Sequence, residues 1–164
     1  MIYRISVFLH VAAACCWVGG LLFFALVLVP VLRGSPDPKT GALVRMVGLR
    51  FRLVGWLSVG VLVITGLLNL AYRVPLAVLA EPLFWLSDFG KLLALKLGLV
   101  TLMLATSVAH DVLGARASAA ALQSPGAPST RALRSAASRL GRAVAVLALA
   151  ILFVAVLLVR GRPG

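Results

Sequence analysis

The chain has 164 residues, of which 62% are hydrophobic and only 12% charged, and its formal net charge is +12. A soluble domain carries about 25% charged residues, and one of this length could not bury so much apolar side chain, so the composition predicts an integral membrane protein. The basic residues flank apolar runs and form no separate basic domain. This excludes nucleic acid as a partner and favours the headgroups of a lipid bilayer.

Four long runs with few charges follow one another along the chain. A membrane-crossing helix needs about 20 mostly apolar residues. We therefore expect an all-α fold, a four-transmembrane-helix bundle in a single membrane domain over residues 1–164, with helices at about 5–32, 53–72, 91–113 and 140–160. The first run is too long for a signal peptide and lacks a cleavage site followed by a polar region, so we expect it to stay in the mature protein.

Two of the connections have a distinct composition. Residues 74–90 are apolar but interrupted by Glu81 and Pro82, which predicts a short interfacial segment between the second and third helices. Residues 114–130 are rich in Ala, Ser, Gly and Pro, which predicts a mobile loop.

The basic residues also predict an orientation. Four spans place both termini on one side of the membrane. The two loops on the opposite side carry Arg33, Lys39, Arg45, Arg50, Arg52, Arg116, Arg131, Arg134, Arg139 and Arg142, whereas the terminal side carries Arg4, Arg73, Lys91, Arg160 and Arg162. Because cytoplasmic loops are enriched in Lys and Arg, we expect cytoplasmic loops and external termini.

Ionisable residues inside the spans are costly and therefore mark candidate functional sites. His10 lies about 9 Å along the helix from Arg4, and Lys96 lies about 12 Å from Asp88, so both are expected at similar depth below the external face. Trp17 shares the helical face of His10, together with the small residues Ala13, Ala14 and Gly20.

On the second helix, a stripe of polar and small residues ends at Asn69. The stripe comprises Gly55, Ser58, Thr65, Gly66 and Asn69. We expect a cavity near the outer leaflet that is formed by His10, Asn69 and Lys96 and lined by small residues. The alternative is that these stripes are only packing surfaces, that His10 bonds a neighbouring helix, and that Lys96 reaches to the interface.

His110 is a second candidate metal ligand, on a face of the third helix shared with Lys96, Met103 and Ser107. We expect it at the cytoplasmic end, beside an ion pair between Asp111 and an arginine. Cys15 and Cys16 diverge by about 100° around their helix and cannot join His10 at one copper ion. They are expected to be buried, inert thiols.

Three segments resemble the copper-resistance-D (CopD) family: "LHVAAACCWVGGLLFF", "LVITGLLNL" and "LALKLGLVTLMLATSVAHD". The resemblance covers about residues 6–160. It implies a bacterial inner-membrane helical protein associated with copper uptake or tolerance.

The first segment is also similar, more distantly, to the HemJ-type protoporphyrinogen oxidases, which share a His, a Trp seven residues later and a Gly two or three residues beyond. His10, Trp17, Gly19 and Gly20 fit that pattern. The resemblance implies haem b binding by His10 and Lys96. The chain departs from the oxidases in lacking an arginine later in the first helix, and in having Leu92 and Ala94 in place of a Trp and a His, which argues against the oxidase activity more than against the cofactor.

The family resemblance favours a protein that handles a redox metal, in copper transport or homeostasis. The residues themselves favour haem b, because the chain has few Met, Cys and His ligands for a copper route but has one flat, small-residue face with candidate axial ligands. The third possibility is a cofactor-free assembly subunit. If the protein is an enzyme, we expect a haem-dependent oxidoreductase. A membrane or periplasmic metal or electron partner and a homo-oligomer are both compatible with the sequence.

Overall fold

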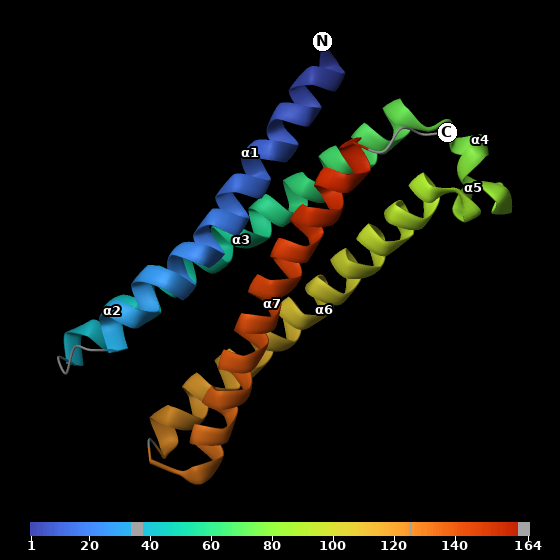
Figure 1. Ribbon diagram of the computed structural model, residues 1–164. Coiled ribbons are helices and arrows are strands. Elements are labelled where there is room, and N and C mark those ends of the chain that lie inside the picture. Colours follow the sequence, from blue (N-terminus) through green and yellow to red (C-terminus); the bar gives the residue numbers. More distant parts are fainter. Residues whose placement is uncertain (34–37, 125, 161–164) are drawn as a thin grey trace. The chain divides into compact units, whose positions relative to one another are not determined.

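The computed structural model describes residues 1–33, 38–124 and 126–160 (Figure 1). Every regular element in these ranges is helical. Four stretches are long and apolar enough to cross a membrane, namely Ile2–Val31, Met46–Arg73, Asp88–Gln123 and Pro128–Arg160. The predicted all-α fold with four membrane-crossing helices is therefore confirmed.

The chain divides into two compact units, Met1–Glu81 and Pro82–Gly164. Unit 1 contains α1 (Ile2–Phe23), the π-helical turn η1 (Phe24–Leu28), α2 (Val29–Arg33), α3 (Pro38–Arg73) and α4 (Leu76–Leu79). Unit 2 contains α5 (Pro82–Leu86), α6 (Asp88–Gln123) and α7 (Pro128–Arg160). Each unit is built around a hairpin of two long helices, α1 with α3 and α6 with α7 (Figure 1).

The helices extend beyond the apolar runs that predict them. The segment 114–130, predicted as a mobile loop, is helical at 114–123, where it continues α6, and again from Pro128, where α7 begins. The prediction was wrong for a physical reason. Its small residues are mainly alanines, which are the strongest helix formers, and one of them, Ala117, is buried on the side of α6 that meets α7.

The first membrane helix changes its winding near its end. Val29 donates its backbone N–H to the carbonyl of Phe24, five residues earlier, which closes the π-turn η1. Pro30 follows at once. It has no N–H, and in a regular α-helix its ring would collide with the carbonyl of Leu26, four residues before it. A π-turn widens the helix at this point and lets the chain continue into α2, so one predicted helix is observed as three consecutive segments.

Ring side chains repeat every seven residues along the side of α1 and η1 that meets α3: Tyr3, His10, Trp17 and Phe24. Their partners run backwards along α3. The ring centroids of Tyr3 and Tyr72 are 5.5 Å apart, and those of Phe24 and Phe51 are 4.7 Å apart. This contact, called the first seam below, is antiparallel. A seven-residue repeat keeps one stripe of a helix against its partner along the whole pair.

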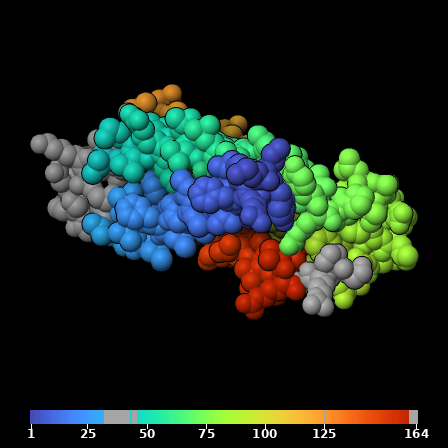
Figure 2. Space-filling model, turned by 90° about the horizontal axis from the view of Figure 1, so that it is seen from above, coloured from blue at the N-terminus to red at the C-terminus, as the bar shows by residue number. Residues whose placement is uncertain are grey.

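The opposite side of α1 carries large apolar side chains that remain exposed, including Ile2, Ile5, Phe8 and Leu9. The view from above shows the N-terminal part of α1, in dark blue, at the surface beside the blue-green residues of α3 (Figure 2). Lipid tails cover exposed apolar side chains on a membrane-crossing helix, whereas the side chains of the first seam pair α1 with α3.

The contact between α6 and α7, called the second seam, also follows a seven-residue repeat. On α6 the series is Phe89, Lys96, Met103, His110 and Ala117; on α7 it is Thr130, Ala137, Val144, Ile151 and Leu158. Seven of these ten residues are buried, and Ala117, Ala137 and the nearby Ala148 let the two backbones approach closely. Dispersion contacts and hydrogen bonds hold such a pair together, because lipid tails are as apolar as the side chains they would replace.

The second hairpin extends past its apolar part. The uncharged run of α7 begins at Ala143, whereas the helix begins at Pro128, so about 22 Å of helix precedes the run. Thr130, only 1% exposed, donates to the carbonyl of Ser124 and ties this end of α7 to the end of α6. The arginines of the extension are exposed: Arg131, Arg134, Arg139 and Arg142.

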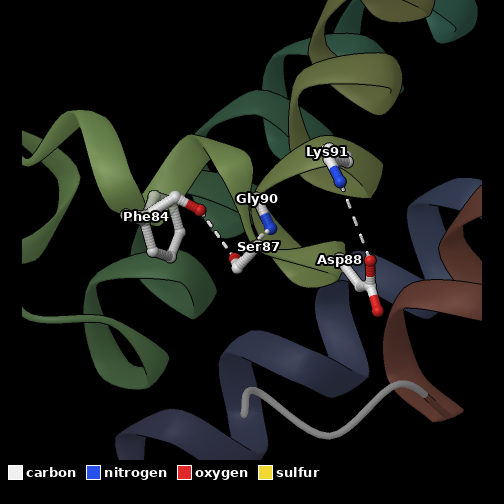
Figure 3. Close-up of polar contacts among 5 residues, drawn as sticks. All are labelled: Phe84, Ser87, Asp88, Gly90 and Lys91. Carbon is white, nitrogen blue, oxygen red and sulfur yellow. Dashed lines mark hydrogen bonds and ion pairs between the residues drawn. The ribbon is translucent and has the colours of Figure 1, made fainter.

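The predicted segment 74–90 consists of the short helices α4 and α5 and the first turn of α6. Pro75 precedes α4 and Pro82 opens α5, positions where a missing N–H costs nothing. Ser87 caps α6: its Oγ accepts from Gly90 N at 3.1 Å and donates to Phe84 O at 2.6 Å (Figure 3). Asp88 lies in the first turn, where the helix dipole favours a carboxylate, and its exposed contact with Lys91 at 4.0 Å contributes little.

Candidate functional site

His10 lies half-buried on the first seam. Its Nδ1 is 2.8 Å from Oγ1 of Thr65, a buried residue of α3. The same hydroxyl lies 2.6 Å from the carbonyl oxygen of Val61, one turn earlier. Gly66 faces the ring, and a Cβ built on it would lie 3.3 Å from His10 Cε1. The histidine in this apolar helix is thus one of four seam rings, packed on a glycine and hydrogen-bonded to the neighbouring helix.

Two further polar residues lie on the first seam one helical turn from His10 and Thr65, toward the N-terminal end of α1. Ser6 is buried and its hydroxyl donates to the backbone carbonyl of Thr65 at 3.4 Å. Asn69 follows Thr65 by one helical turn on α3, and its Oδ1 is buried without a hydrogen-bond donor among the described residues. The predicted association of His10 with the polar stripe of the second membrane helix is thus present in unit 1, and Asn69 belongs to it.

Trp17 lies on the same seam, about 10 Å along α1 from His10. It is 8% exposed, and its indole covers Gly55, where a built Cβ would lie 3.6 Å from the indole Cδ1. The small residues that were expected to leave space for a flat ligand therefore accommodate protein rings instead: Gly66 accommodates His10, Gly55 accommodates Trp17, and Gly20 accommodates Phe51. Between α1 and α3 the alternative of a packing surface accounts for the glycines.

His110 occupies the corresponding kind of position in unit 2. Its Nδ1 is 2.8 Å from the carbonyl oxygen of Ala137 on α7, and a Cβ on Gly141 would lie 3.1 Å from its Cε1. Because a carbonyl only accepts, Nδ1 of His110 carries the hydrogen. The ring is half-buried, just outside the uncharged run of α7 and beside exposed arginines. Its predicted place at the basic end of the third membrane helix agrees with this geometry.

Lys96 belongs to the second seam, fourteen residues before His110. In an antiparallel pair this puts it level with the residue fourteen positions after Ala137, which is Ile151. Ile151 is the midpoint of the uncharged run 143–159, so the half-buried Lys96 lies about 12 Å from either end of that run. Met103 lies between Lys96 and His110. It is buried, and its sulfur accepts a 3.5 Å hydrogen bond from Ser107.

The two cysteines were predicted to be buried, and this was wrong. Cys15 and Cys16 are both exposed free thiols on the outer side of α1. The series Tyr3, His10, Trp17 and Phe24 determines which side of the helix meets α3, and both cysteines lie off it. Within the ranges that the structure describes, no three or more His, Cys, Asp or Glu side chains come together as a metal site.

Comparison with known families gives a match to the model for copper resistance protein D over residues 45–158. The chain belongs to the CopD family. An uncharacterised protein of Aquifex aeolicus (strain VF5) is 45% identical over 67 residues, which cover 40% of this chain and 46% of that protein. The matched region is thus less than half of that relative. No solved structure gave a significant match.

The CopD match begins within α3 and runs into α7, so it includes Asn69, Lys96 and His110 and leaves out α1 with His10. Sequence reasoning also did not identify the partners of the two histidines. Thr65 was part of the polar stripe and could have been paired with His10 from the antiparallel register of two adjacent helices. Ala137 contributes a backbone carbonyl, which leaves no signal in a sequence.

Proposed function

We propose that this CopD-family protein handles copper as a cargo within the membrane, in copper transport or homeostasis. The observation that carries the proposal, beside the family, is the matched placement of the two histidines. Each hairpin holds one half-buried imidazole on its seam, with Nδ1 against an oxygen of the partner helix. Imidazole nitrogen is a good copper ligand, and a ligand histidine commonly has its other nitrogen bonded to an oxygen of the protein.

The small number of candidate ligands suits a copper ion that is bound transiently during passage. A resident metal needs three or four converging side chains, and the described residues offer no cluster of three or more His, Cys, Asp or Glu. Passage instead requires binding that is strong enough for entry and weak enough for release. We therefore assign His10 and His110 as separate, transient binding sites for copper. His110 lies at the basic end of the second hairpin. Buried Met103 would be a soft ligand between His110 and the middle of the span.

The proposal includes a bacterial inner-membrane location with external termini. On that orientation His10 lies near the external side and His110 near the cytoplasmic side. Variants that lack Cys15 and Cys16 and carry a single cysteine at Ile2 or Ser129, labelled in whole cells by an impermeant maleimide, would test it. Only the Ile2→Cys variant should react.

The decisive experiment measures copper uptake by proteoliposomes that contain the parent, His10→Ala or His110→Ala. Each substitution should reduce the initial rate of Cu(I) uptake at least tenfold, since each removes a ligand. The matched control is Ser118→Ala, which changes an exposed residue about 12 Å along α6 from His110 and should leave the rate unchanged. Equal uptake by the parent and both histidine variants would reject copper as the cargo.

Haem b is the second candidate, with His10 and Lys96 as ligands and Trp17 and Asn69 lining the site. The buried Oδ1 of Asn69, which lacks a described donor, favours a bound group near His10. The first seam itself does not fit a macrocycle, because the His10 and Trp17 rings already fill the space over Gly66 and Gly55. A haem would have to approach His10 from the side away from α3, and when bound it would supply one-electron chemistry.

An absorption spectrum of the purified protein, oxidised and dithionite-reduced, separates the candidates on one sample. A Soret band that is lost in His10→Ala would replace the copper proposal with haem. A colourless protein without copper uptake would leave the cofactor-free assembly subunit.

A further inference from the structure

One side of α7, just outside its uncharged run, carries arginines and no acidic residues. This side, called the arginine face below, spans an arc of about 140°. It comprises Arg131, Arg134, Ser135, Ser138, Arg139 and Arg142, all of which are exposed. We propose that its outer half, Arg131 and Arg134, is a docking surface for an acidic segment of a soluble protein. The proposal stands on unit 2 alone and goes beyond the proposed function, since it does not depend on the cargo.

The side of the extension opposite the arginine face is packed. Leu133 and Leu140 are half-buried there, and Ala137 is buried on the second seam. Thr130 donates to the carbonyl of Ser124 at 3.0 Å and ties the start of α7 to the end of α6. The arginines are therefore presented by a rigid pair of helices, and a partner that binds them does not have to order the backbone.

The charge pattern of the arginine face is unfavourable within the chain itself. Arg131 and Arg134 are three residues apart, as are Arg139 and Arg142, and like charges at this spacing destabilise a helix. Arg139 donates to the neutral Ser135 Oγ at 3.4 Å. The sequence has no Asp or Glu from residue 112 to residue 142, whereas a solvated helix usually mixes the two signs. The face is thus complementary to carboxylates that another molecule supplies.

The reach of the extension separates the outer arginines from the lipid headgroups. The headgroup region on each side of a bilayer is about 5–8 Å thick. From Ala143, α7 rises about 6 Å to Arg139, but about 14 Å to Arg134 and about 18 Å to Arg131. Arg139 and Arg142 therefore lie at the level of the headgroups, whereas Arg131 and Arg134 stand in the water beyond them.

The residue type favours an acidic protein as the partner of the outer pair. A guanidinium binds a carboxylate or a phosphate through two parallel hydrogen bonds, which the ammonium of lysine cannot do. Lipid phosphates lie below Arg131 and Arg134, which leaves carboxylates. Side chains three residues apart on a helix are about 5–6 Å apart at Cβ, so the pair fits two acidic side chains about one helical turn apart. A second copy of this face would be repelled.

The test titrates the full-length protein, in phosphatidylcholine nanodiscs at low salt, into a fluorescein-labelled decaglutamate peptide and follows the anisotropy. Arg131→Gln with Arg134→Gln should weaken binding at least tenfold. Arg131→Lys with Arg134→Lys keeps the charge and should weaken it about threefold, because the paired hydrogen bonds are lost. The matched control, Arg73→Gln with Arg160→Gln, removes the same charge from the last turns of α3 and α7 and should change the affinity less than twofold.

Three results would overturn the proposal. Equal losses for the outer pair and the control would mean that the peptide follows only the net charge. A larger loss for Arg139→Gln with Arg142→Gln would move the site to the level of the headgroups. Tighter binding of an oligothymidylate of the same charge, with the same dependence on Arg131 and Arg134, would replace the acidic protein with a nucleic acid. Unchanged thermal unfolding of each variant verifies that the hairpin remains folded.

Discussion

The two seams solve the same packing problem with different atoms. In the first, His10 bonds a threonine hydroxyl and packs on Gly66; in the second, His110 bonds the Ala137 carbonyl and packs on Gly141. The first arrangement depends on one replaceable side chain, whereas the second depends only on where the backbone of α7 runs. The hydrogen bond of His10 can therefore be removed by point substitution at Thr65, whereas that of His110 is made by a main-chain carbonyl, which no side-chain substitution removes.

The largest loss of stability is expected at Gly90, because this glycine lies directly against the backbone of Phe84 and Trp85. A Cβ on Gly90 would overlap Phe84 O and Trp85 Cα, which cannot move without opening the cap of α6 (Figure 3). We expect Gly90→Ala to destabilise the protein by about 3 kcal/mol, the upper part of the range for overpacking. Thermal denaturation in detergent measures it. Gly98→Ala, with nothing within 4 Å, is the matched control and should be neutral or stabilising.

A smaller effect separates the two seams directly. A Cβ on Gly141 would approach His110 Cε1 to 3.1 Å, and one on Gly66 would approach His10 Cε1 to 3.3 Å. We expect Gly141→Ala to cost about 1–2 kcal/mol and to shift the 15N signals of His110, because the hydrogen bond to Ala137 already holds the imidazole against the backbone of α7. Gly66→Ala should cost less and shift only the signals of His10. A larger loss for Gly66→Ala would reverse the proposed difference between the seams.

The smallest effect is expected outside both seams. Cys15 and Cys16 are exposed and point away from α3. Replacing both by alanine should change the free energy of unfolding by less than about 0.5 kcal/mol and leave copper uptake intact. The parallel substitution Ala13→Leu, at a buried seam position, should be clearly destabilising. Loss of copper uptake in the double cysteine variant would show that thiols take part in the route.

The fold followed from the sequence to the extent that it rests on hydrophobicity. Four apolar runs gave four membrane-crossing helices, because no other structure except a closed barrel satisfies its backbone in lipid. The ends of the helices did not follow. Alanine-rich residues 114–123 looked like a loop by composition, yet they continue α6 because alanine favours helix and fits a close seam. The exposure of Cys15 and Cys16 required knowledge of which side of α1 meets α3.

The candidate site was predictable in part. His10, Trp17 and Asn69 were placed on facing stripes, and unit 1 brings these stripes together. The spacing of residues in the sequence could not predict whether the glycines make room for a ligand or for a protein side chain. Small residues allow either a ligand or a protein ring to approach, and only coordinates distinguish Gly66 under His10 from an empty surface. The role of Ala137 was hidden for a different reason, since its contact is made by the main chain.

The length of α7 has a mechanical consequence. The helix runs unbroken from the middle of its apolar run at Ile151 to Pro128, about 35 Å away, and Thr130 ties its end to α6. A stiff rod pivoted in the bilayer magnifies small motions, so a 10° tilt of this hairpin about Ile151 would move its tip by about 6 Å. A fluorophore on the exposed Ser129 would act as a pointer, converting rearrangements around Lys96 and Met103 into displacements large enough to measure in water.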